Sequence, residues 1–143
     1  MNKVAIVFWS GSGNTEAMAN AIKEGVQKAG TICDLNFVSD FDVASVGSYD
    51  GIMLGCPAMG AEVLEEGEFQ PVYDEIENLL SGKPVALFGS YGWGSGEWME
   101  NWEVQVKDAG GDLFEKGLII NEAPDEDGLK ACEEFGMRFV QSK

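Results

Sequence analysis

The feature that most constrains this chain is the alternation of short apolar segments with longer amphipathic ones. Each apolar segment is rich in β-branched or aliphatic residues and ends in a turn signal, as expected of a buried strand. Five such segments predict strands over residues 4–9, 32–38, 51–56, 84–90 and 113–121. Because these segments are apolar on both sides, they fit the interior of a parallel sheet that is covered on both faces.

Apolar residues recur at helical spacing between most of these strands, and each stripe predicts a helix with one buried face. The clearest stripe consists of Phe69, Val72, Tyr73, Ile76, Leu79 and Leu80. The other three consist of Met18, Ile22, Val26 and Ala29; of Trp98, Trp102, Val106 and Ala109; and of Leu129, Cys132, Gly136, Phe139 and Val140. Residues 39–49 predict only a short helix or a loop. The alternation indicates a doubly wound α/β fold, in one domain over residues 1–143.

The charge balance narrows the choice of partners. The chain has 9 basic and 25 acidic residues and a formal net charge of −16, while hydrophobic residues make up 45% of it, which is enough for a folded core. An acidic surface repels nucleic acid and anionic membranes, and it favours partners with basic patches. No segment is long and apolar enough for a signal peptide or a membrane span, so we expect a monomer in the cytoplasm.

The inventory of reactive side chains is small. The chain has no histidine, and its three cysteines, Cys33, Cys56 and Cys132, are scattered without a C-x-x-C spacing. A zinc site and an imidazole base are therefore excluded. Each cysteine is expected to be a small buried hydrophobic residue.

A loop rich in glycine and hydroxyl groups follows the first predicted strand and consists of Ser10, Gly11, Ser12, Gly13, Asn14 and Thr15. It opens directly into a predicted helix, so its amide N–H groups converge where anions bind. No Gly-Lys-Ser/Thr follows, and Glu16 stands where a dinucleotide-binding loop has its third glycine. Neutral donors fit a terminal monophosphate, and a simple Gly/Ser turn with a helix cap is the alternative.

Two further loops follow the third and fourth predicted strands. The first consists of Pro57, Ala58, Met59, Gly60, Ala61 and Glu62, and the second of Ser90, Tyr91, Gly92, Trp93 and Gly94. Exposing an indole to water loses a few kcal/mol of burial free energy. Trp93, which lies between two glycines, is therefore predicted to cover a flat ligand. A core tryptophan is the alternative. Ligands of doubly wound sheets bind beyond the carboxyl ends of the strands, where these three loops lie.

The three loops are similar, in order and spacing, to the FMN-binding loops of the short-chain flavodoxins of anaerobic bacteria. The resemblance covers essentially the whole chain, including an uninterrupted fifth strand that lacks the insertion of long-chain flavodoxins. It implies a five-stranded parallel sheet in the order 2-1-3-4-5. It also implies non-covalently bound FMN as the cofactor, and neither catalytic nor metal-binding residues.

The resemblance also implies a role for each loop. Residues 10–15 would hold the FMN phosphate, while Met59 would lie on the inner face of the isoalloxazine and Trp93 on its outer face. Glu62 would accept a hydrogen bond from the flavin N3–H. Backbone amides around Gly92 would meet the pyrimidine oxygens, and Asn121 would contact the flavin edge.

In the family, the peptide that corresponds to Gly60–Ala61 rotates when the flavin takes its first electron, and the Gly60 carbonyl would then bond to N5–H. Many relatives carry Asp, Asn or Ser in place of Ala61. The resemblance places Glu62 near the flavin N1. Its charge and the acidity of the whole chain disfavour the anionic hydroquinone. We therefore expect a low-potential one-electron carrier that shuttles between semiquinone and hydroquinone and substitutes for ferredoxin.

Acidic residues concentrate in and just after the predicted loops. They are Glu62, Glu65, Glu66, Glu68, Glu97, Asp125, Glu126 and Asp127. Any one of them fits a solvated surface position. Together they predict a docking surface for redox enzymes with basic patches, such as reductases and ferredoxin-dependent oxidoreductases.

Two other classes of protein are weighed against this prediction. An FMN-dependent reductase with its own substrate needs groups for proton or hydride transfer, and this chain has no histidine and little sequence beyond the fold. A signalling receiver domain shares the topology, but it needs paired acids after the first strand, an acid after the third and a lysine after the fifth. In this chain Ser10 and Gly11 follow the first strand, Pro57 follows the third, and Asn121 stands at the end of the fifth.

Overall fold

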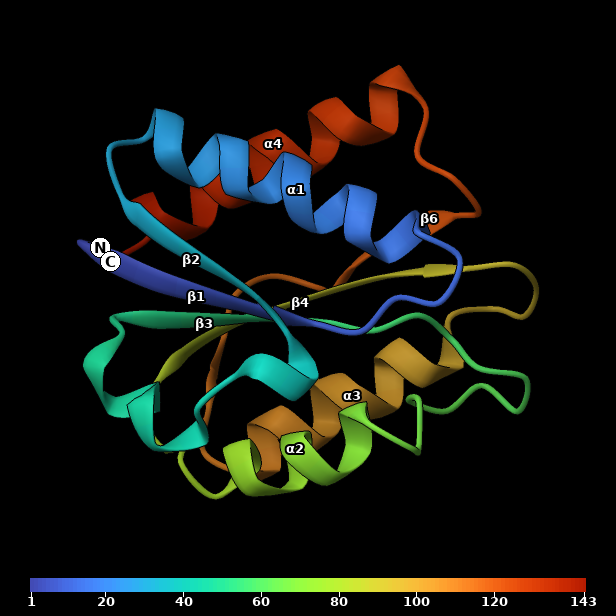
Figure 1. Cartoon of the computed structure of the whole chain (residues 1–143), viewed down its shortest axis with the longest axis horizontal. Helices are drawn as coiled ribbons and strands as arrows, with labels where there is room; N and C mark the ends of the chain where they lie inside the picture. The colour runs from blue at the N-terminus through green and yellow to red at the C-terminus, as the bar shows by residue number, and fades with distance from the viewer.

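The computed structural model describes all 143 residues and contains one parallel sheet with helices on both faces (Figure 1). Its strands are β1 (Lys3–Phe8), β2 (Ile32–Phe37), β3 (Gly51–Gly55), β4 (Pro84–Tyr91), β5 (Asp112–Leu113) and β6 (Leu118–Asn121). Its helices are α1 (Asn14–Lys28), α2 (Phe69–Glu77), α3 (Glu97–Asp108) and α4 (Glu126–Gln141). Two 3₁₀ helices, η1 (Val38–Asp40) and η2 (Val43–Ser48), occupy the segment with the weaker pattern. The predicted doubly wound α/β fold is confirmed.

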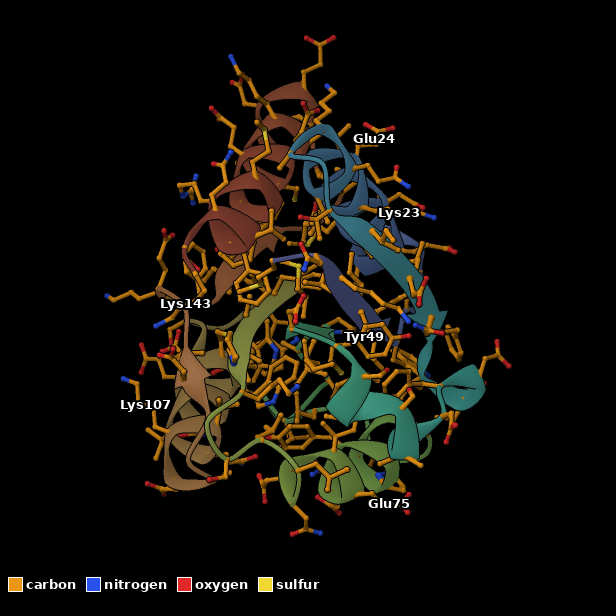
Figure 2. The ribbon with its side chains drawn as sticks, turned by 90° about the vertical axis from the view of Figure 1, so that its left-hand side faces the viewer. Lys23, Glu24, Tyr49, Glu75, Lys107 and Lys143 are labelled. Carbon is orange, nitrogen blue, oxygen red and sulfur yellow. The ribbon has the colours of Figure 1, made fainter.

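The strands follow the order β2-β1-β3-β4-β5, and every pair is parallel. The winding reverses between β1 and β3, so α1 and α4 cover one face of the sheet while α2 and α3 cover the other (Figure 1). Figure 2 shows the three layers edge-on, with Lys23, Glu24 and Glu75 on the outer surfaces of the helices. None of these helices combines the length and the apolar composition needed to cross a bilayer.

Each face of the sheet has its own apolar core, and β1 contributes to both. Val4, Ile6 and Phe8 pack beneath α1 and α4, whereas Ala5 and Val7 pack against the α2 and α3 side. All five side chains are buried. Burial on both faces explains why the strand is apolar at every position from residue 4 to residue 8 rather than at alternate ones.

The prediction of an uninterrupted fifth strand is wrong. β5 pairs with β4 at Pro84 and Val85, and β6 pairs with β4 from Phe88 to Tyr91. Paired residues of β4 and β5 are 28 positions apart in the sequence, as are Pro84 and Asp112. Paired residues of β4 and β6 are 30 positions apart, as are Phe88 and Leu118. Two extra residues therefore interrupt the strand, and the sheet has six strands rather than five.

Side-chain packing explains this interruption. The ring of Phe114 packs against the rings of Phe135 and Phe139 on α4, at centroid distances of 5.6 and 5.4 Å. The next residue, Glu115, has a φ of 50°, which turns the chain out of the extended conformation. Glu115, Lys116 and Gly117 lie between the two strands, so a short polar segment that ends in glycine marks the interruption in the sequence.

The helical stripes are confirmed except at two leucines. Leu79 is 46% exposed because α2 ends at Glu77, one turn earlier than the stripe predicts. Leu129 is 38% exposed near the start of α4, where it borders a cavity of about 490 Å³ between α1 and α4. Each of these two leucines lies close to an end of its helix.

Two glycines let the backbones of α1 and α4 touch. A Cβ atom on Gly25 would lie 1.9 Å from the carbonyl oxygen of Glu133, and a Cβ atom on Gly136 would lie 2.5 Å from that of Ile22. Neither carbonyl can move without breaking its own helix. The close pairing of these helices therefore depends on the absence of a side chain at both positions.

We expect Gly136→Ala to lower the free energy of unfolding by about 1–3 kcal/mol, because the new methyl group forces α1 and α4 apart. Urea denaturation followed by circular dichroism measures the change. Gly47→Ala is the matched control, since its Cβ atom would meet nothing within 4 Å. Equal stability of the two variants would show that the helices separate without cost.

Candidate functional site

The loops that follow β1, β3, β4 and β6 come together at one edge of the sheet, opposite the two chain termini (Figure 1). They enclose a cavity of about 210 Å³, which is lined by Ser12, Asn14, Pro57, Ala58, Ser90, Tyr91, Gly92 and Glu122. All but Glu122 were predicted as site residues. The structure thus brings together the three loops that the sequence singles out.

The loop after β1 forms an open helix N-terminus. Gly13 precedes α1 with a φ of 96°, a left-handed conformation that favours glycine, and its position has no side-chain cap. The Ser10 hydroxyl oxygen accepts hydrogen bonds from the backbone N–H groups of Gly13 and Glu16, both at 3.2 Å. Ser10 therefore fixes the shape of the loop. The amides of Asn14 and Thr15 have no acceptor within the helix, which suits them to an anion.

Thr15 and Ser90 join this loop to the fourth strand. Their hydroxyl oxygens lie 2.8 Å apart, and both residues are almost fully buried. The backbone N–H of Ser90 also donates to the Thr15 hydroxyl oxygen at 3.4 Å. The Thr15 hydroxyl therefore lies beneath the loop, against β4, whereas Ser12 and Asn14 line the cavity.

A tight turn forms the tip of the loop after β3. The backbone N–H of Glu62 donates to the carbonyl of Met59 at 2.8 Å, and the N–H of Met59 donates to the carbonyl of Val63 at 2.9 Å. Gly60 and Ala61 both lack a positive φ, as in a type I turn, and Glu62 follows with a φ of 52°. A type I turn followed by a left-handed residue closes a short hairpin.

Glu62 couples this turn to the loop after β4. Its carboxylate oxygen Oε1 accepts a hydrogen bond from the backbone N–H of Gly96 at 3.2 Å. A Cβ atom on Gly94 would lie 2.4 Å from the same oxygen, so only glycine leaves room for the carboxylate there. Gly94 also has a φ of 93°. The Glu62 carboxylate therefore links the loop after β3 to the loop after β4.

Trp93 lies at the tip of the loop after β4 and is 66% exposed. The alternative of a core tryptophan is therefore wrong. By contrast, Trp98 and Trp102, on the helix that follows, are fully buried. An indole left in water between two glycines is available to stack on a ligand ring.

Asn121 and Glu122 support the same loop from the end of β6. The Asn121 side-chain amide donates to the carbonyls of Tyr91 and Gly92, at 3.2 and 3.4 Å. The backbone N–H of Glu122 donates to the Tyr91 carbonyl at 2.7 Å, and Glu122 has a φ of 56°. Glu122 was not predicted as a site residue, because an acidic residue after a strand carries no signal of a cavity.

Several acidic residues near the site have structural roles. The Glu65 carboxylate accepts hydrogen bonds from the backbone N–H groups of Gly67, Glu68 and Phe69 at the start of α2. Partial burial raises the pKa of Glu65, but the three hydrogen bonds outweigh it and hold the pKa below its usual value. Asp125 similarly caps α4 through the N–H of Gly128.

The three cysteines are buried and free, as predicted. Burial raises the pKa of Cys33, Cys56 and Cys132 to about 12. A thiol with such a pKa stays protonated near neutral pH and is a poor nucleophile. The cysteines therefore contribute packing rather than chemistry.

A doubly wound sheet with an open helix N-terminus after β1, at the switch point between β1 and β3, defines a mononucleotide-binding α/β protein. The donors suit a phosphate monoester, since the loops around the cavity supply amides and hydroxyls but no lysine or arginine. The exposed face of Trp93 suits a flat ring beside it.

Comparisons with known proteins identify the family within this class. The sequence profile of the family described as Flavodoxin matches residues 6–136. The flavodoxin of Megasphaera elsdenii is 47% identical over 133 residues, which cover 93% of this chain and 95% of that protein. The flavodoxin of Clostridium beijerinckii is also 47% identical, over 94% of this chain and 97% of that one. The chain belongs to the flavodoxin family.

Solved structures agree with this assignment. The solution structure of two-electron reduced Megasphaera elsdenii flavodoxin has a TM-score of 0.88 and 45% identity, and it matches 96% of this chain and 98% of that one. A flavodoxin from the domain Archaea has a TM-score of 0.90 at 25% identity, over 98% of this chain and 97% of that one. The chain is thus an electron-transfer flavoprotein, and its cofactor is FMN.

Proposed function

We propose that the chain is a low-potential one-electron carrier that serves ferredoxin-dependent oxidoreductases and reductases, and that it turns over no substrate of its own. The observation that carries the proposal is that the open N-terminus of α1 borders the cavity through Ser12 and Asn14, while the exposed Trp93 directly follows Gly92, which lines the same cavity. This arrangement suits a held cofactor and leaves little room for a second molecule beside it.

The bound isoalloxazine supplies the redox chemistry, and the residues around it bind and orient it. We propose that the phosphate is held by Ser10, Gly11, Ser12, Gly13, Asn14 and Thr15. Ser10 and Thr15 also fix the shape of the loop through their own hydrogen bonds. Pro57, Ala58, Met59, Gly60, Ala61 and Glu62 would border one side of the ring. Ser90, Tyr91, Gly92, Trp93 and Gly94 would border the other side, with Asn121 fixing the backbone of Tyr91 and Gly92.

The negative charge around the site supports a low potential. Glu62 and Glu122 lie in loops that border the cavity, and the chain as a whole carries a net charge of −16. Adding an electron brings another negative charge into this field, which costs free energy. The apolar side chains of Met59 and Trp93 provide no charge to offset that cost.

We expect the purified protein to take up one FMN per chain, with the absorbance spectrum of an oxidised flavin. Trp93→Ala should weaken FMN binding about 10–100-fold, since one lost stacking contact costs about 1–3 kcal/mol. Fluorescence titration of FMN measures the dissociation constant. Trp93→Phe is the matched control, because it keeps a ring that stacks, and it should stay within about tenfold of wild type. A wild-type chain that does not bind FMN contradicts the proposal.

Ala61 bears on the potential through the turn at residues 59–62. Rotation of the Gly60–Ala61 peptide converts a type I turn into a type II turn, which needs a positive φ at Ala61. That conformation costs about 1–2 kcal/mol for a residue with a Cβ atom and little for glycine. Ala61 therefore favours the observed type I turn, in which the Gly60 carbonyl is not rotated.

We expect Ala61→Gly to raise the potential of the first one-electron step by about 40–85 mV, the equivalent of that strain energy. Spectroelectrochemical titration of the FMN-loaded protein measures both one-electron steps. Ala61→Val is the control and should leave the first potential at or below that of wild type. A titration that shows one two-electron step would contradict the one-electron carrier itself.

Unpaired acidic residues support docking to basic partners. The structure has four ion pairs, Lys3–Asp34, Lys28–Glu133, Arg138–Glu115 and Lys143–Asp112, and none involves an acidic residue of the predicted docking surface. Within that surface, Glu66, Glu97, Glu126 and Asp127 are exposed. Their field is free to steer a basic protein towards the cofactor edge.

We expect electron transfer from the reduced protein to a basic c-type cytochrome to slow as the salt concentration rises from 10 to about 150 mM, because salt screens surface charges. Stopped-flow absorbance measures the rate. Glu97→Lys should reduce the low-salt rate more than Glu75→Lys, which lies on the outer surface of α2 (Figure 2). A rate that is indifferent to salt would contradict this docking surface.

We also propose that residues 1–143 act as one monomeric domain in the cytoplasm. All six strands belong to one sheet, which supports a single domain. The three free thiols fit a reducing compartment.

A further inference from the structure

Trp9 lies between two of the loops that form the site. It follows β1 directly, and its backbone N–H donates to the Gly55 carbonyl at 3.0 Å, at the point where β3 ends. Its side chain is half-buried and packs against the core on the α2 and α3 side of the sheet. The core therefore holds the indole in place independently of its contacts with the loops.

The indole lies directly against the phosphate-binding loop. A Cβ atom on Gly11 would stand 2.9 Å from Cη2 of the ring and 3.3 Å from Cζ3. The absence of a side chain at Gly11 therefore lets the loop backbone rest on the outer edge of the indole. Ser10 and Gly13, on either side of Gly11, are joined by the hydrogen bond that shapes the loop.

The polar edge of the same indole reaches the segment after β3. Its Nε1–H donates to the Glu68 carboxylate at 3.1 Å. Glu68 itself is fixed, because its backbone N–H donates to the Glu65 carboxylate at 2.7 Å. The backbone N–H of Glu65 in turn donates to the Cys56 sulfur at the end of β3, at 3.4 Å.

From this geometry we infer that Trp9 is a positioning residue for the phosphate of FMN: its indole, anchored on Glu68, braces the loop at Gly11. The inference rests on the proposed role of residues 10–15 in binding the phosphate. A braced loop presents its amides to the anion without first being ordered, which favours binding. Trp9 itself touches the loop rather than the cavity, since it is absent from the cavity lining.

Comparing FMN with riboflavin tests this role, because riboflavin has the same ring but no phosphate. We expect Trp9→Phe, which keeps an aromatic ring but loses the N–H, to weaken FMN binding about tenfold or more, as one lost charge-assisted hydrogen bond would. Riboflavin binding should stay within about twofold of wild type. Fluorescence titration gives both dissociation constants, and their ratio is the quantity that decides.

Two variants of the partner separate anchoring from packing. Glu68→Gln keeps an acceptor oxygen but loses the charge, so it should weaken FMN binding less than Trp9→Phe does. Glu68→Leu removes the acceptor and should reproduce the selective loss of FMN binding seen with Trp9→Phe. Thermal unfolding of each variant, followed by circular dichroism, shows that the fold is intact.

An equal loss of FMN and riboflavin binding in Trp9→Phe would overturn the inference, because it would place the indole against the ring or in a purely structural role. Unchanged binding of both ligands would overturn it as well. A wild-type chain that binds neither flavin would instead contradict the proposed function. The two failures are therefore distinguishable.

Discussion

Burial of the sheet on both faces is the constraint on which the rest of this structure depends. Once α1 and α4 cover one face and α2 and α3 the other, the strands have no free surface for chemistry. Only the ends of the strands remain, and the parallel arrangement gathers all the carboxyl ends at one edge. The reversal of winding between β1 and β3 separates the helices that follow them, so that the loops at this edge can enclose a ligand.

The loops at this edge are held by one another as much as by the sheet. The Thr15 and Ser90 hydroxyls connect the loop after β1 to β4, and the Glu62 carboxylate connects the loop after β3 to Gly96. The Asn121 amide ties the end of β6 to the loop after β4. A site built from such cross-links is ordered before a ligand arrives, which lowers the entropic cost of binding.

Much of the fold and of the site could be predicted, and the failures have definite physical causes. Three loops in the right order predicted seven of the eight residues that line the cavity, because glycine and hydroxyl residues after strands are local signals. The break between β5 and β6 was missed although the polar Glu115 and Lys116 and the turn-forming Gly117 lie in it, because the apolar residues on either side fit one continuous strand. Glu122 was missed because its place in the cavity follows from its contact with Tyr91, on another strand.

The sequence by itself determined the class of fold, the three loops and the acidic surface, since periodicity, glycine spacing and charge are all written locally along the chain. Only the tertiary structure decided what each side chain in those loops does. It turned the Thr15 hydroxyl towards Ser90, left Trp93 exposed, and set the indole of Trp9 between Gly11 and Glu68. These outcomes depend on contacts between residues up to 75 positions apart, which no local pattern specifies.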